Sequence, residues 1–129
     1  ANLAAGSDYT LFIGGTVSAP TVTLIQDNNT PSTSSSLPVE ARVLNGVNGG
    51  NSTVTVNAGG KQVGANVAFG AASAYTPIAA FAGTATVNVS IGGVALAPMI
   101  DQTFNSGGVY TILVYGDASA PQVLINQDH

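Results

Sequence analysis

The sequence contains no cysteine and no tryptophan, and its only histidine is the last residue. Without cysteine the chain has no disulfide bond, no catalytic thiol and no thiolate metal site. His129 lies at the chain end, where the backbone tends to fray, so neither a Ser-His-Asp system nor a histidine metal site is expected. We therefore expect a protein that is not an enzyme and that has no catalytic residue, metal site or bound cofactor.

Positive charge is almost absent, because Arg42 and Lys61 are the only lysine or arginine residues. Two fixed cations cannot neutralise enough phosphates to hold nucleic acid, which excludes that partner. Asp27-Asn28-Asn29 and Asp117 carry oxygen ligands of the kind Ca²⁺ takes, but they lack the spacing of a calcium loop, and turn formation is the favoured interpretation. No run reaches the roughly 18 apolar residues of a membrane span, so we expect no insertion into a membrane.

The remaining composition is 45% hydrophobic and otherwise rich in Thr, Ser, Asn and Gly, which is typical of a neutral-polar β surface. Apolar residues alternate along the clearest strand, 84–91, so Val87 and Val89 should be buried while Thr86 and Asn88 face outward. Gly92-Gly93 then predicts a two-residue hairpin turn. Many short strands between Gly, Pro and Asn turns predict an all-β, immunoglobulin-like, two-sheet antiparallel sandwich of about seven to nine strands.

An internal repeat organises the chain. Residues 9–15 (YTLFIGG) return as 110–116 (YTILVYG), Ser-Ala-Pro at 18–20 returns at 119–121, and Gln-Asp at 26–27 returns at 127–128, always 101 positions later. The repeat predicts three parts: residues 1–28 as the last two strands of a further repeat, residues 29–38 as a Ser/Thr/Pro linker, and residues 39–129 as a complete module.

The partial repeat creates a pairing problem. Its counterpart strands already occupy their place in the complete module, so the N-terminal hairpin should pair with a different sheet edge, in its own chain or in a neighbour. The candidate strand-donor residues are Tyr9, Leu11, Ile13, Val22 and Leu24. We expect the intact chain to self-associate and a chain without residues 1–28 to stay a folded monomer.

Short motifs along the chain resemble a known family. They are Arg42-Val43-Leu44-Asn45, Val54-Thr55-Val56, Val67-Ala68-Phe69-Gly70 with Ser73-Ala74-Tyr75, and Tyr110-Thr111 with Gly116. In these the module is similar to the domain-of-unknown-function family 4397. The resemblance implies an immunoglobulin-like β-sandwich in tandem arrays on extracytoplasmic proteins of bacteria and archaea, with no established activity.

Two functions fit these features of the sequence. The first is a non-enzymatic structural subunit, extracellular or at a prokaryotic cell surface, that joins copies of itself into a fibre or layer by β-strand complementation. The alternative is a cell-surface adhesion module that binds carbohydrate or protein, with an exposed aromatic such as Tyr75 or Tyr115 as its platform.

Overall fold

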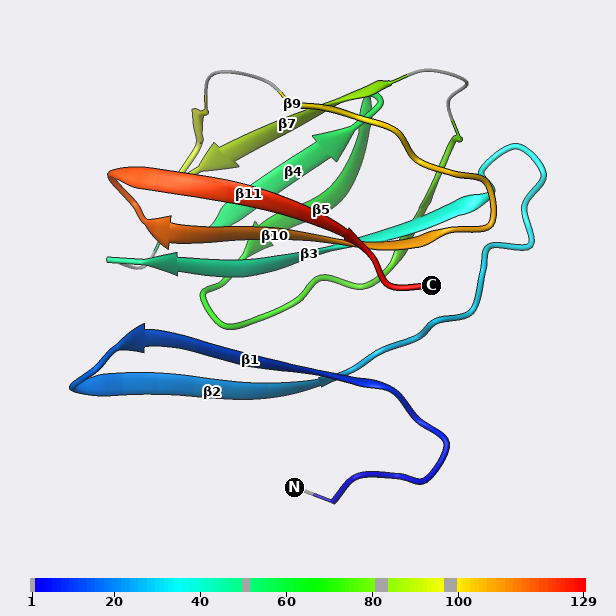
Figure 1. Ribbon diagram of the computed structural model, residues 1–129. Coiled ribbons are helices and arrows are strands. Elements are labelled where there is room, and N and C mark those ends of the chain that lie inside the picture. The colour runs from blue at the N-terminus through cyan, green and yellow to red at the C-terminus, as the bar shows by residue number, and fades with distance from the viewer. Residues whose placement is uncertain (1, 50–51, 81–83, 97–99) are drawn as a thin grey trace.

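The computed structural model describes residues 2–49, 52–80, 84–96 and 100–129 (Figure 1). All regular secondary structure in these residues is β-strand. The strands are β1 (Tyr9–Thr16), β2 (Ala19–Gln26), β3 (Val39–Asn48), β4 (Val54–Ala58), β5 (Lys61–Val67), β6 (Thr76–Ile78), β7 (Ala85–Ile91), β8 (Val94–Ala95), β9 (Ile100–Gln102), β10 (Val109–Asp117) and β11 (Ala120–Gln127). The predicted all-β sandwich is confirmed.

Strands β3–β11 form two sheets that pack on each other. One sheet has the order β11-β10-β3-β6, and the other has the order β5-β4-β7-β8 with β9 also paired to β7. The ladder between β3 and β10 is parallel, whereas the other ladders are antiparallel. A parallel pair needs a long connection, and here the whole second sheet lies in the chain between β3 and β10.

Strand β7 shows why the alternation predicts this fold. Val87 and Val89 are buried, and the alternating residues Thr86 and Asn88 stay partly exposed, as expected. The turn that follows has φ of 57° at Gly92 and 83° at Gly93, the two positive values that a type I′ hairpin turn requires. Glycine adopts both without steric cost, so the chain reverses directly into β8.

The core fills the space between the two sheets. Its side chains come from alternate positions of the strands, mainly valine, and β10 contributes Tyr110, Ile112 and Val114. Phe104 is fully buried and meets the Tyr110 ring edge-on at 5.0 Å between centroids. This aromatic pair anchors the connection between β9 and β10 to the core.

Strands β1 and β2 stand apart from both sheets as a two-stranded antiparallel hairpin. Residues 27–38 connect this hairpin to β3 without forming a strand. The hairpin lies beside β3 on the outer face of the β11-β10-β3-β6 sheet, the face turned away from the core (Figure 1). Within the described residues it therefore joins the sandwich by packing face to face, not by pairing with the sheet edge that the sequence led us to expect.

The repeat allows a matched stability test. Ile112 is fully buried, whereas its repeat counterpart Leu11 is 59% exposed. We expect Ile112→Ala to lower the free energy of unfolding by about 2–5 kcal/mol, because it leaves a core cavity. Leu11→Ala should change it by less than about 0.5 kcal/mol. Urea titrations of both variants measure the difference, and equal losses would contradict the opposite orientation of the two hairpins.

Candidate assembly interface

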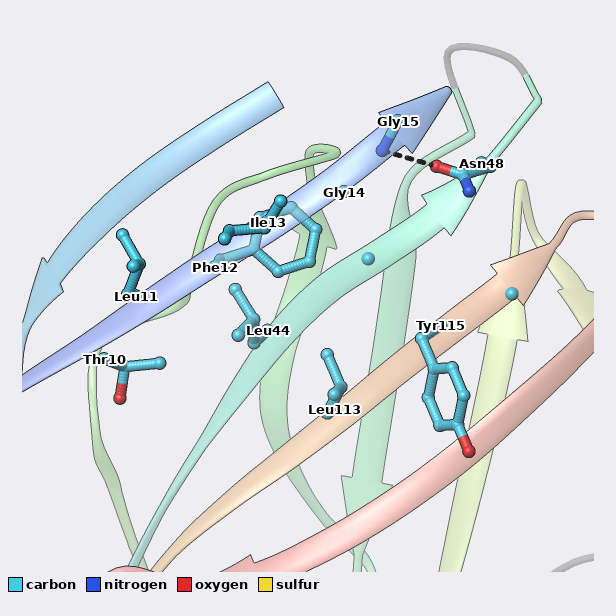
Figure 2. A pocket seen from close by; sticks show the side chains of 12 residues that line it. Thr10, Leu11, Phe12, Ile13, Gly14, Gly15, Leu44, Asn48, Leu113 and Tyr115 are labelled. Atoms are coloured by element: carbon cyan, nitrogen blue, oxygen red, sulfur yellow. Dashed lines mark hydrogen bonds between the residues drawn. The ribbon is translucent and has the colours of Figure 1, made fainter. Parts of the chain in front are cut away.

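The inner face of the hairpin is held on β3 by one aromatic ring. Phe12 is 8% exposed and meets Phe69 edge-on at 5.9 Å. A Cβ atom built on Gly46 of β3 would lie 2.9 Å from the Phe12 ring, and one built on Gly14 would lie 2.4 Å from it. The ring thus occupies the space that side chains at these two glycines would fill, as Figure 2 shows for Phe12 and Gly14.

Polar contacts lock the two ends of the same face. The Gly15 N–H donates to Asn48 Oδ1 at 3.0 Å, at the end of β3 (Figure 2). At the other end, Arg42 Nη2 donates to Thr10 Oγ1 at 3.0 Å and forms an ion pair with Asp27 Oδ1 at 2.5 Å. Arg42 is 1% exposed, so this guanidinium depends on hairpin oxygen atoms for its counter-charge.

The repeat brings two equivalent Thr-Asp pairs to this guanidinium. Thr10 donates to Asp27, and its counterpart Thr111 donates to Asp128 at 2.5 Å. Arg42 Nε donates to Thr111 Oγ1 at 3.0 Å, so one side chain of β3 connects the pair of the hairpin with the pair of the module. Interpreting Asp27 as a turn residue was therefore wrong, because its carboxylate faces a buried cation. The repeated Thr and Asp positions and the scarcity of arginine were the signal that sequence reasoning missed.

The aromatic candidates lie in different environments. Tyr75 is partly buried, with its ring 4.9 Å from the Arg42 guanidinium carbon, so it covers the cation and is no exposed platform. Burial raises the pKa of the Tyr75 hydroxyl above its ordinary value near 10. Tyr115 is 36% exposed and donates to Gln122 Oε1 at 3.0 Å.

His129 and the possible metal ligands are the remaining candidates for a catalytic or metal site. The backbone of His129 accepts a hydrogen bond from the Val109 N–H at 3.0 Å, so the expected fraying of the last residue is not seen. Within the described ranges, no three His, Cys, Asp or Glu side chains gather in a way that holds a metal ion. The same part of the chain contains no helix with the length and apolar character needed to cross a membrane.

The outer face of the hairpin carries the five candidate strand-donor residues. They alternate along β1 (Tyr9, Leu11 and Ile13) and β2 (Val22 and Leu24). Across the ladder Leu11 lies opposite Leu24 and Ile13 lies opposite Val22, while Tyr9 lies opposite Gln26. Leu11, Ile13 and Val22 are each about 60% exposed or more. Their counterparts in the complete module all face the core: Tyr110, Ile112 and Val114 are buried, and Val123 and Ile125 pack against the core. A face with the composition of a sandwich core is therefore left in solvent.

A groove runs along the edge of β1 that faces away from β2 (Figure 2). It encloses about 530 Å³; residues 10–15 form one side, and Leu44, Leu113 and Tyr115 are among the side chains on the other. Most of these side chains are apolar. The exposed face and the groove adjoin along the same strand, so we treat them together as the candidate interface.

Comparison with models of known protein families and with curated protein sequences gives no match. The geometry of the hairpin and the internal repeat are therefore the features that indicate a function.

The Arg42–Asp27 pair generates a test of how the hairpin is held. We expect Asp27→Ala to weaken hairpin docking by about 3–5 kcal/mol, since it leaves a buried cation without its partner. Amide hydrogen exchange at Phe12 should then accelerate while Val87 in the core keeps its protection. Asp101→Ala, which removes an exposed carboxylate on β9, is the control and should leave both rates unchanged. Unaltered exchange at Phe12 in Asp27→Ala would refute the anchoring role of the ion pair.

Proposed function

We propose that this protein is a non-enzymatic structural subunit of an extracellular or cell-surface array, in which the β1–β2 hairpin joins the chain to copies of the same repeat. One observation carries the proposal: five hairpin residues that are exposed or partly exposed have counterparts that build the core face of β10 and β11. An apolar face of this kind marks an interaction surface.

The size of the exposed face indicates how the contact is made. Burying Leu11, Ile13 and Val22, already about one-third covered, contributes about 1–2 kcal/mol for each side chain. Association costs about 4–15 kcal/mol in lost freedom, so these three side chains alone give a weak contact. A lasting assembly requires more, and the unpaired edge of β1 offers backbone hydrogen bonds beside the same face. Strand complementation uses both.

The surface chemistry supports an extracellular setting. Two basic residues and six acidic ones give a net charge of −4 over 129 residues, and Thr, Ser, Asn and Gly are frequent among the uncharged residues. The resemblance to family 4397 supports the same proposal, including an immunoglobulin-like sandwich and a prokaryotic cell-surface location. Both remain parts of the proposal.

An adhesion function is the second candidate, and the position of Tyr115 favours it. Its ring is partly exposed at the side of the groove, where an aromatic face offers a stacking surface to a sugar or to a peptide. Such a function predicts that Tyr115→Ala abolishes ligand binding and leaves self-association unaltered.

The structural proposal predicts concentration-dependent self-association. We expect the intact chain to form dimers or larger species and Ile13→Asp to remain monomeric, because the new carboxylate lies in the centre of the exposed hairpin face. Val94→Asp is a matched control, since Val94 on β8 of the other sheet is 71% exposed and Ile13 is 67% exposed. Sedimentation velocity across a range of concentrations measures all three proteins.

Two outcomes would contradict the proposal: a monomeric wild-type chain at high concentration, or the same loss of association in Val94→Asp. Removing residues 1–28 is a less specific test than we expected from the sequence, because it also uncovers Leu44 and Arg42, which the hairpin buries. New apolar surface on the shortened chain is itself a cause of association.

A further inference from the structure

Strand β1 has an edge whose backbone groups point into the groove. The Asp27 N–H donates to the Asp8 carbonyl at 2.9 Å, which fixes the alternation of the β1–β2 ladder. Leu11 and Ile13 consequently turn their N–H and C=O groups away from β2. In the part of the chain that the structure describes, β1 pairs only with β2. On that edge the Gly15 N–H is already used by Asn48, at the end of the groove.

The repeat identifies the strand that suits this edge. Strand β10 is the counterpart of β1, and its corresponding edge pairs in parallel with β3. In that ladder Thr111 lies opposite Arg42, and Leu113 lies opposite Leu44. We call the equivalent of β3 in another copy of the repeat a β3-type strand. Beside β1, in the same register, such a strand would bring its arginine opposite Thr10 and its leucine opposite Phe12.

The groove has the place for such a strand. It lies between β1 and the outer face of β10, and Leu113 and Tyr115 of β10 line it; the Tyr115 ring extends from β10 toward β11 (Figure 2). Two stacked sheets pack about 10 Å apart, so a strand added to the edge of β1 would lie over β10 as β1 itself lies over β3. The side chains of that strand at alternate positions would then cover Leu113 and Tyr115.

A carboxylate in a smaller hollow beside the groove supplies the matching charge. Asp128 accepts hydrogen bonds from Thr111 and Asn126, and in the described residues it has no ion-pair partner. It lines a hollow of about 170 Å³ together with Thr10, Thr111 and Leu113. Asp27, its counterpart, is paired with Arg42. An arginine opposite Thr10 would stand above Thr111 and Asp128, as Arg42 stands beside Thr10 and Asp27.

We propose that this groove binds an extended strand of the β3 type, parallel to β1, with its arginine paired to Asp128. The occupant is the β3-type strand of another copy of the repeat. That copy is a module that lacks its own last hairpin, the equivalent of β10 and β11. The inference rests on the proposed function and deepens it, because it names the element of the partner, its direction and its charged anchor.

The probe is a synthetic peptide with the sequence of residues 39–48, VEARVLNGVN, added to the full chain at a concentration where the chain is monomeric. We expect the peptide to shift the backbone amide resonances of Leu11 and Ile13 and to slow their hydrogen exchange. A nitroxide at the N-terminus of the peptide should broaden the resonance of Tyr9 more than that of Gly15, as parallel pairing requires. Broadening centred on Gly15, or no response at millimolar peptide, would overturn the inference.

Paired variants test the edge and the anchor separately. Ile13→Pro removes a groove-facing N–H and should abolish binding, whereas Val22→Pro, which alters the opposite edge of the hairpin, should retain it. Asp128→Asn should weaken binding about tenfold, as should Arg-to-Ala in the peptide, and combining the two should weaken it little further. Asp101→Asn should have no effect. Equal losses in Ile13→Pro and Val22→Pro, or in Asp128→Asn and Asp101→Asn, would refute the proposed register.

These results are independent of self-association. Peptide binding by a chain that stays monomeric at every concentration would support the groove and refute the homopolymer. Self-association without peptide binding would refute the groove and leave the structural function in place.

Discussion

The buried guanidinium of Arg42 is the constraint on which the arrangement of hairpin and sandwich depends. A cation that is 1% exposed must have a counter-charge nearby, and Asp27 beyond the end of β2 supplies it. Thr10, Thr111 and the Tyr75 ring complete its surroundings. Because these contacts come from the hairpin, from β10 and from the segment before β6, one side chain fixes how three parts of the chain meet.

Local physics made much of the fold predictable. Alternation along β7, the positive φ values that Gly92 and Gly93 adopt, and the repeat between β1–β2 and β10–β11 are all written in short stretches of sequence. They predict strands, turns and the equivalence of two hairpins. The five residues named as strand donors share one exposed face for the same reason, since a period of two places them on one side of the ladder.

What the sequence did not reveal depends on contacts between distant strands. The parallel ladder of β3 with β10 and the docking of β1 over β3 each bring together residues far apart in the chain. Gly14 and Gly46 illustrate the difficulty. Glycine in a sequence predicts a turn or a bulge, yet here both residues leave space for the Phe12 ring. Asp27 likewise follows a strand in a run of turn residues, and only the position of Arg42 gives it another role.

The arrangement leaves an imbalance that favours a partner. The described residues hold two copies of the last hairpin and two Thr-Asp pairs but one strand of the β3 type, and the sequence has one arginine. Its own β3 already lies between β10 and β6, so it cannot also pair with β1. A second β3-type strand in the groove would place its arginine by Thr111 and Asp128. The hairpin, extended by this strand, would then face the β11-β10-β3-β6 sheet. Each of the two would pair its one arginine with a Thr-Asp pair of the other, in an approximate two-fold arrangement about an axis along the strands. The partner that fits is therefore a repeat whose β3-type strand lacks its own last hairpin, since the β3 of this chain is already paired on both edges.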